Sequence, residues 1–425
     1  MSRKAEYSGN KKKRPFVSVL VIAMIIIGII ALGIMYLYQK SETAKINAEL
    51  AELVAQDQAE AEAEEAEYEA LVADIEANYS FYEKLAAGYD VNILLVGDSF
   101  AAGSGSSSSD TRWYNLLADE LETEYMDGTD FDGDVVVTSV AMSGATAYSG
   151  YVRLAGLDDD TDYDLVIICI GQNDEEEDFA LYYEALIRAA ESRYEGCEII
   201  AVLESNELNY MDISYMDEES ENELTDESYT EKLTVIKTLA SYYGIQVADM
   251  PEAYVNSGYE YEDLTSDGTY PNDDGHRLYA DTVEAVIAEN VAALTGKTQS
   301  MAAYDEAVSV FDNFAWFAAE SDNEDAAVFT QTDDLTYTLS LSDSDSVGAA
   351  CVLGLDLTWE YGDNIVYVYV DDVLYTTLEC SRDSGSSYRC VVLAGEDFVP
   401  GSEISIVYED EDTAEGFYGI VLSWE

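Results

Sequence analysis

The chain has 425 residues, enough for two or three domains, and 48% of them are hydrophobic, enough to bury sizeable cores. It carries 88 acidic residues against 19 Lys and Arg, a formal net charge of −69. Such a surface repels nucleic-acid phosphates and anionic lipids, so neither is an expected partner. The hydrophobic content and the 34 Tyr residues distinguish the chain from a disordered acidic sequence.

The first segment combines a basic tail with an apolar run. Residues 1–15 contain six Lys and Arg residues, and residues 16–38 are 23 positions without a charge, long enough to cross a bilayer as a helix. The basic side of such a helix stays in the cytoplasm. We therefore expect a single-pass cell-membrane protein with an extracellular body; the flanking residues disfavour the alternative, a cleaved signal peptide.

Residues 39–88 are rich in Ala and Glu and are expected to form an acidic helical stalk. Apolar residues recur near both ends, whereas the middle consists largely of Ala and acidic residues. A coiled coil would need a continuous apolar seam along the whole helix. The pattern predicts a self-repelling helix that holds the body away from the membrane. It gives no support to oligomerisation.

Residues 89–297 alternate apolar runs with helical stretches, which predicts a parallel sheet covered by helices on both faces. The expected strands are Ile93–Val96, Val135–Val140, Leu165–Ile170, Ile199–Leu203 and Ile245–Val247. The expected helices are Trp113–Leu121, Phe179–Arg193, Tyr229–Tyr243 and His276–Leu294. The acidic segment Asn206–Asp226 has no periodicity and is expected to be a loop near the edge of the site.

From residue 298 to residue 425 the pattern changes to short strands separated by Asp, Gly and Ser turns, which predicts an antiparallel β-sandwich. The expected strands are Thr336–Leu341, Ala349–Thr358, Asn364–Val370, Leu374–Glu379, Tyr388–Leu393, Glu403–Tyr408 and Phe417–Trp424. Within the third of these, valines alternate with Tyr367 and Tyr369. The tyrosines either face a bound sugar or lie in a second buried face.

Five cysteines are present, so at least one is unpaired within a monomer. Cys380 and Cys390 flank a turn rich in Ser and Gly and can pair across a hairpin outside the cell. Cys169 lies in an apolar run and is expected to be a buried thiol. With one histidine and no Cys/His cluster of zinc spacing, the sequence gives no reason to expect a metal or another cofactor.

Four short blocks lie after predicted strands or before the last helix. They are Gly97–Phe100, Ser143–Gly144, Gly171–Asp174 and Ser266–His276. Because ligands gather at the carboxyl edge of a parallel sheet, we expect these blocks to meet there. Ser99 offers a hydroxyl nucleophile, and the backbone N–H groups of Ser99 and Gly144 and the side-chain amide of Asn173 offer donors for an oxyanion.

With these blocks in this order, residues 89–297 resemble the SGNH/GDSL hydrolase family. The resemblance implies a flavodoxin-like three-layer α/β/α fold and hydrolysis of esters, often acetyl groups on sugars or cell-envelope polymers. It also implies Ser99 as the nucleophile, with Gly144 and Asn173 completing the oxyanion hole. It implies nothing about the stalk or the sandwich.

The last block departs from the family's pattern of Asp, two residues, His and Pro. Asp267, the expected acid, and Pro271 match the pattern, but Tyr270 occupies the place of the histidine. Asp273 precedes His276, the only imidazole in the chain, by three positions, so the same spacing recurs in a shifted register.

Two arrangements of the catalytic base are therefore open. In the first, a rearranged loop brings His276 to Ser99, with Asp267 or Asp273 as the acid that orients it. In the second, Tyr270 stands at the position of the base and His276 packs on the last helix, which the flanking Pro271 and Asn272 favour. A phenol with a pKa of about 10 is a poor base at neutral pH, so the second arrangement leaves activity in question.

The sequence thus predicts a membrane-anchored, extracellular serine ester hydrolase. Its expected substrate is an acylated, foremost acetylated, glycan of the cell surface or the environment, or a small ester. Two other functions stay open. A non-catalytic glycan-binding or scaffold protein on the same fold is the alternative that Tyr270 raises. An O-acyltransferase using the same serine is the other, because its first half-reaction is identical.

Overall fold

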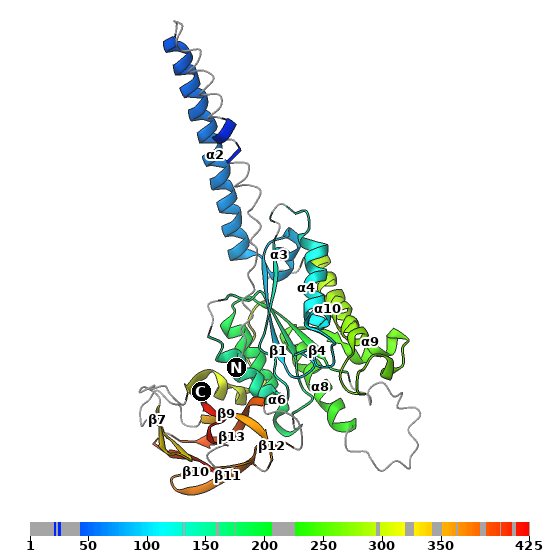
Figure 1. Cartoon of the computed structure of the whole chain (residues 1–425), viewed down its shortest axis with the longest axis vertical. Coiled ribbons are helices and arrows are strands. Elements are labelled where there is room, and N and C mark those ends of the chain that lie inside the picture. Colours follow the sequence, from blue (N-terminus) through cyan, green and yellow to red (C-terminus); the bar gives the residue numbers. More distant parts are fainter. Residues whose placement is uncertain are drawn as a thin grey trace.

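The structure is a computed structural model that describes residues 21–22, 24–26, 43–129, 131, 133–158, 161–174, 176–205, 226–294, 298–318, 327–341, 351–362, 364–382, 388–399, 401–409 and 414–424. Figure 1 shows a long helix, a central α/β domain and a C-terminal β domain. Apart from five positions, the expected membrane span lies outside the described residues, as does the loop expected before Asp226. None of the helices among the described residues is long and apolar enough to span a membrane.

The central domain is built on a parallel sheet whose strands follow the order β2-β1-β3-β4-β5. The strands are β1 (Val91–Gly97), β2 (Val135–Ser139), β3 (Leu165–Cys169), β4 (Glu198–Leu203) and β5 (Gln246–Asp249). This is the flavodoxin-like order, in which the direction of strand addition reverses between β1 and β3 while all strands stay parallel. The predicted parallel sheet is confirmed, and its inner strands are continuous apolar runs because helices bury both faces.

Helices cover the sheet on both sides. One face packs against α3 (Phe81–Ala87), α4 (Trp113–Leu121), α9 (Met250–Ser257) and α10 (Asp273–Ala293). The other packs against α5 (Ala147–Ala155), α6 (Glu176–Arg193) and α8 (Asp226–Tyr243). Short helical turns are η1 (Ser109–Thr111), η2 (Glu122–Met126), η4 (Tyr261–Asp263) and η5 (Glu306–Phe311). The four predicted helices are present; α3, α5 and α9 were not predicted as elements of the domain.

The stalk is the helix α2 (Thr43–Asn78), whose 36 residues give a length of about 54 Å at 1.5 Å per residue. Its last turn is attached to the body, because Ile75 is buried and Glu76 accepts a hydrogen bond of 2.8 Å from Tyr89 Oη. After it, α3 belongs to the core of the α/β domain. The expected helix is present and projects from the α/β domain (Figure 1), and contacts with that domain begin at Tyr68, whose ring centroid lies 6.1 Å from that of Phe131.

The C-terminal domain consists of two packed, mainly antiparallel sheets. Its strands are β6 (Asn313–Ala318), β7 (Ala327–Asp333), β8 (Thr336–Leu341), β9 (Cys351–Tyr361), β10 (Ile365–Val370), β11 (Val373–Glu379), β12 (Ser381–Arg382), β13 (Tyr388–Phe398), β14 (Glu403–Tyr408) and β15 (Phe417–Trp424). One sheet has the order β11-β10-β14-β8-β7, and the other β12-β9-β15-β6 with β13 paired to β9. The predicted antiparallel domain is confirmed. Tyr367 and Tyr369 are half-buried rather than part of a second core.

All five cysteines are buried free thiols, so the disulfide that Cys380 and Cys390 could form across the hairpin is absent. Cys380 packs in the sandwich core, whereas the thiol of Cys390 points to the other domain and lies 3.8 Å from the carbonyl oxygen of Gly144. Cys169 is the buried strand thiol that its apolar surroundings predicted.

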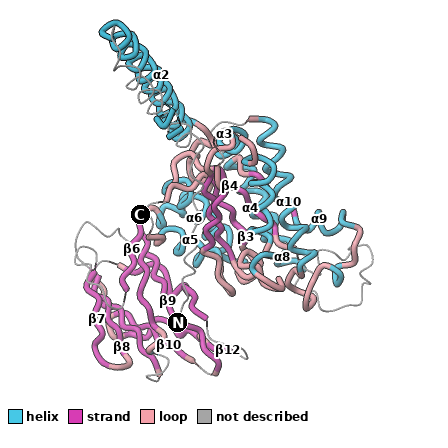
Figure 2. Tube along the Cα trace, turned by 45° about the horizontal axis from the view of Figure 1, so that its top comes forward, coloured by secondary structure: helices cyan, strands magenta, loops and turns pink. Residues whose placement is uncertain are grey.

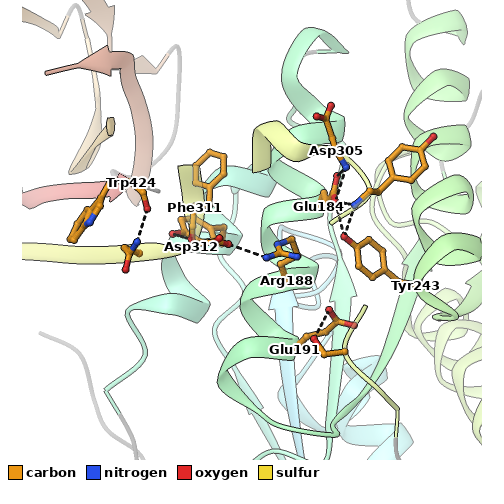
Figure 3. Close-up of polar contacts among 12 residues, drawn as sticks. Glu184, Arg188, Glu191, Tyr243, Asp305, Phe311, Asp312 and Trp424 are labelled. Atoms are coloured by element: carbon orange, nitrogen blue, oxygen red, sulfur yellow. Dashed lines mark hydrogen bonds and ion pairs between the residues drawn. The ribbon is translucent and has the colours of Figure 1, made fainter. Parts of the chain in front are cut away.

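The two domains share one hydrophobic core. Val352, Val391 and Val421 of the sandwich pack in the same cluster as Tyr148 and Tyr151 of α5. The connecting segment is fixed as well. Figure 3 shows the Glu184 carboxylate of α6 accepting from the backbone N–H of Asp305 and, at 2.6 Å, from Tyr243 Oη. The sandwich is therefore a packed part of the molecule rather than a module on a free linker.

Candidate active site

Ser99 stands at the carboxyl edge of the sheet, two residues after the last residue of β1. The turn is tight, because a Cβ added to Gly97 would lie 2.0 Å from the carbonyl oxygen of Cys169. It is closed by a 2.9 Å hydrogen bond from the backbone N–H of Ser104 to the Ser99 carbonyl. Ser99 is 6% exposed, and its hydroxyl takes part in none of the hydrogen bonds between described residues. The Ser99 hydroxyl is therefore held at the edge of the sheet and has no hydrogen-bond partner among the described residues.

The first three sequence blocks meet at this edge. The Asn173 side-chain amide donates to Asp98 Oδ2 and to the carbonyl oxygen of Ala145, both at 3.1 Å. The backbone N–H of Met142 donates to the Gly97 carbonyl at 2.9 Å. The expected convergence is thus present. Both hydrogens of the Asn173 amide are already used, so an oxyanion would have to replace the Ala145 carbonyl as an acceptor.

Gly144 turns the chain from β2 into α5. Its φ of 76° lies in the left-handed region, where glycine is favoured. Thr146 then caps α5 by accepting from the backbone N–H of Ser149, and Asp174 Oδ1 accepts from the backbone N–H of Ala147 at 2.8 Å. The role of Gly144 in the oxyanion hole stays a prediction. The contacts of the neighbouring blocks hold the backbone that follows Gly144 in place.

The Tyr270 segment lies against the Ser99 turn. The ring centroid of Tyr270 is 5.5 Å from that of Phe100, the residue after Ser99. Asp267 Oδ1 accepts from the backbone N–H groups of Thr269 and Tyr270 at 3.0 and 2.9 Å, so this carboxylate closes its own turn. Tyr270 therefore lies against the Ser99 turn, where the resemblance expects the base. No hydrogen bond between described residues joins its hydroxyl to Ser99.

His276 has a different set of contacts. It is fully buried in the first turn of α10, and its Nε2 donates to the Ser104 carbonyl over 3.1 Å. Asp273 binds the backbone N–H and the hydroxyl of Ser107 at 2.8 and 2.6 Å. The shifted pair thus holds the loop that follows Ser99. The role of His276 as the base, with Asp273 or Asp267 as its acid, stays a prediction that no contact among the described residues supports.

Sequence reasoning gave no role to three buried carboxyl groups below the Ser99 turn. Asp98, Asp174 and Glu204 are 0%, 9% and 3% exposed. Burial raises the pKa of Asp174 to about 7 and raises those of Asp98 and Glu204 as well. The ammonium of Lys232, 6% exposed, donates to the Asp174 carbonyl at 2.8 Å. The sequence signal for this buried cluster is Glu204, which directly follows the apolar strand β4.

Comparisons with known proteins agree with the fold. The profile of the GDSL-like lipase/acylhydrolase family matches residues 95–278. Two crystal structures of a two-domain esterase active on acetylated mannans, one co-crystallized with mannopentaose, superpose with TM-scores of 0.61 and 0.60. They are 16% and 17% identical in sequence, and each match covers 80% of this chain and 93% of the other. At this identity the likeness concerns the fold, and it spans both domains.

No curated protein matches the chain by sequence. The family match and the meeting of the nucleophile, glycine and Asn blocks at one sheet edge support a serine esterase. Residues 95–278 are therefore a domain of the GDSL-like lipase/acylhydrolase family, joined to a C-terminal β-sandwich.

Proposed function

We propose that the chain is a membrane-anchored, extracellular serine esterase that removes acyl groups, acetyl groups foremost, from glycans. The family domain supports ester hydrolysis. The observation that carries the proposal is the meeting of the Ser99 turn, the Gly144 turn and Asn173 at one edge of the sheet. A nucleophile and donors for a developing negative charge are what acyl transfer requires.

The reaction proceeds through an acyl-enzyme. The Ser99 hydroxyl attacks the acyl carbonyl carbon, the glycan hydroxyl leaves, and water then releases the acid and restores the serine. The negative oxygen of each tetrahedral intermediate binds the backbone N–H groups of Ser99 and Gly144. The Asn173 amide joins them when it exchanges the Ala145 carbonyl for this oxygen. Loss of one such donor costs about 3 kcal/mol of barrier.

The proton of Ser99 has no imidazole acceptor among the described residues, because His276 binds Ser104 and a tyrosine stands in the expected place. A tyrosine hydroxyl accepts protons poorly at neutral pH. We therefore expect proton loss to water or hydroxide, slow hydrolysis, and a rate that rises with pH. Restoring an imidazole by Tyr270→His is expected to raise kcat by about 100-fold.

A groove between the two domains supports a glycan as the substrate. It measures about 410 Å³ and is lined by Met142 beside the Gly144 turn, by Arg153 of α5 and by Trp316 of β6. Trp316 is 38% exposed. A flat aromatic face beside charged groups suits the apolar faces and hydroxyls of a sugar. Since the two-domain esterase of the same fold is active on acetylated mannans, an acetylated mannan is the first substrate to test.

The test measures acetate release from an acetylated mannan, and hydrolysis of p-nitrophenyl acetate, by the full-length chain. Ser99→Ala is expected to abolish both. Ser109→Ala changes an exposed serine at the start of η1 and serves as the matched control, which should keep the rate of the unchanged chain. Equal rates for the unchanged chain and Ser99→Ala would remove Ser99 from the reaction and overturn the proposal.

A non-catalytic glycan-binding protein is the second candidate, and the position of Tyr270 favours it. It predicts that the unchanged chain binds mannan oligosaccharides without releasing acetate and that Trp316→Ala weakens this binding. If Tyr270→His is inactive as well, the second candidate replaces the first, because an imidazole beside Ser99 would then fail to create an active site.

The extracellular location is part of the proposal. It is supported by the basic residues before the uncharged run of residues 16–38 and by the absence of basic clusters in the acidic body. Protease added to intact cells should degrade the body while sparing an epitope fused at residue 1. Degradation only after the cells are lysed would place the body inside.

A further inference from the structure

Three carboxyl groups lie buried under the nucleophile turn, and the proposed reaction uses none of them. Asp98, Asp174 and Glu204 follow β1, β3 and β4 at the carboxyl edge of the sheet, and none is more than 9% exposed. Burying an ionised carboxylate without compensation is costly, so the contacts of each group have to account for its charge.

Asp98 is surrounded by hydrogen-bond donors. Its Oδ1 accepts from the backbone N–H of Phe100 at 2.9 Å, and its Oδ2 accepts from the Asn173 amide at 3.1 Å. The backbone N–H of Gln172 lies nearby and also favours its ionised form. Amide N–H groups only donate, and the two that bind this carboxyl identify Asp98 as the ionised acceptor.

The carboxyl group of Glu204 lies beside that of Asp98, close enough for the two groups to share a proton. Two ionised carboxylates have no proton to share, so the pair carries one. Because Asp98 is the acceptor of two other hydrogen bonds, the shared proton belongs to Glu204. Glu204 follows β4 directly, and the thiol of Cys169 lies 3.7 Å from its Oε1.

We propose that Glu204 is a positioning residue that is protonated at neutral pH, donates its proton to the Asp98 carboxylate, and so fixes the Asn173 amide beside Ser99. This inference rests on the proposed function, because it names how one donor of that site is held. Asp98 links the two, since it binds Glu204 and Asn173 together.

The hydrogen bond from Glu204 to Asp98 is expected to be lost at alkaline pH. Burial and the Asp98 charge raise the pKa of Glu204 well above its ordinary value. Once Glu204 loses its proton, two carboxylates face each other in a buried site, and their repulsion pulls Asp98 from Asn173. The titratable groups that face the pair are Asp174, Lys232, Cys169, Tyr183 and Tyr279. Of these, Lys232 is the cation that favours an ionised Asp98.

The test compares Glu204→Gln with Glu204→Ala in the full-length chain. Gln keeps a donor for Asp98 and cannot ionise, whereas Ala removes the donor. Glu198→Gln is the matched control, because Glu198 is 7% exposed at the opposite end of the same strand and binds Thr298 instead. Circular dichroism verifies that each variant is folded.

Two readouts do not depend on activity. The infrared band of a protonated carboxylic acid is expected at neutral pH in the unchanged chain and in Glu198→Gln, and it should weaken in Glu204→Gln. The side-chain amide NMR signal of Asn173, assigned through Asn173→Asp, is expected to move in Glu204→Ala and to stay in place in Glu204→Gln. An unchanged infrared band in Glu204→Gln, or an unmoved amide signal in Glu204→Ala, overturns the inference.

The kinetic readout tests the link to Ser99. Glu204→Ala is expected to lower kcat at least about tenfold with little change in KM, because a misplaced donor acts on the transition state. Glu204→Gln should match the unchanged chain at neutral pH and exceed it at alkaline pH. Equal loss in both variants would overturn the inference. If Ser99→Ala leaves hydrolysis unchanged, the proposed function fails, and the infrared and NMR readouts still decide the Glu204 network.

Discussion

His276 lies without exposed surface in the first turn of α10, where its Nε2 hydrogen-bonds to the Ser104 carbonyl. A carbonyl only accepts, so the proton of the neutral ring sits on Nε2, and Nδ1 has no partner among the described residues. Burial is the main reason that the pKa of His276 is lowered. The residue thus supports the loop after Ser99 as a neutral donor.

Replacing His276 with Gln separates this structural role from a catalytic one. A Gln amide can donate to Ser104 but cannot act as a base, so the variant should fold and retain most of the hydrolysis of p-nitrophenyl acetate. Arg277→Gln, at the exposed neighbour in the same helix turn, is the control. A loss of several orders of magnitude in kcat with an unchanged fold would instead identify His276 as the base.

The His276→Gln variant should also change how the stability of the protein depends on pH. The folded ring binds a proton less readily than the unfolded one, so between its lowered pKa and about pH 6.5 the unfolded chain holds more protons. Stability contributed by neutral His276 is therefore lost as pH falls through that window. In His276→Gln, thermal unfolding followed from about pH 8 to pH 5 should show a smaller loss than in the unchanged chain. An identical loss in both would contradict this account.

Among elements, α5 connects the active-site edge to the sandwich. The helix begins directly after the Gly144 turn, and Tyr151 Oη hydrogen-bonds to the Phe311 carbonyl at 3.1 Å and to Ser423 Oγ at 3.0 Å. A Cβ on Gly354 of β9 would lie 2.2 Å from the hydroxyl of Tyr148. The sandwich therefore fixes the helix that in turn holds Gly144.

Asp356 of β9 is the charged part of this contact. It is 2% exposed and binds Arg389 at 2.8 and 2.6 Å and Arg153 of α5 at 3.4 Å. Asp356→Ala leaves two half-buried arginines without their carboxylate, which should lower the free energy of unfolding by about 3 kcal/mol. Because α5 then loses an anchor, kcat for p-nitrophenyl acetate should fall.

Asp312→Ala is the matched control, since its pair with Arg188 is more exposed, at 45% and 26%. That change should cost less than about 1 kcal/mol. Denaturant unfolding and ester hydrolysis measure both effects. Equal destabilisation by the two variants would mean that Asp356 is not an anchor of α5.

The helix α5 shows why some elements could not be predicted from the sequence. The inner strands were predictable because burial on both faces leaves uninterrupted Val, Ile and Leu. In α5, residues 147–152 are all buried between two domains, so the alternation of apolar and polar residues that reveals a surface helix is missing. β6, with the sequence NFAWFA, and β7 similarly lack a regular period.

The site was predictable to a similar degree. Ser99, Gly144 and Asn173 follow strands, so chain order alone predicts that their segments meet. Glu204 acts on the site only through Asp98, a three-dimensional relation that no spacing in the sequence reveals. The contact of His276 likewise depends on how the loop after Ser99 folds back onto α10.

For the whole molecule, charge is the dominant feature. Figure 2 shows α2 and the β domain on different sides of the α/β domain. The stalk helix alone contains 11 acidic residues and one lysine. With a net charge of −69, repulsion acts within the stalk, within the body and between them. The ion pairs between described residues are few and mostly part-exposed, so they offset little of it.

Ionic strength should therefore stabilise the protein. At about 0.01 M salt the Debye length is about 30 Å and much of the acidic surface interacts, whereas at about 0.15 M it shrinks to about 8 Å. We expect the Tm of the full-length chain to rise by several degrees between these conditions. NaCl and KCl should act equally if screening is the cause, and differently if one cation binds a specific site. A Tm that falls with salt would show that ion pairs outweigh the repulsion, because screening weakens attraction and repulsion alike.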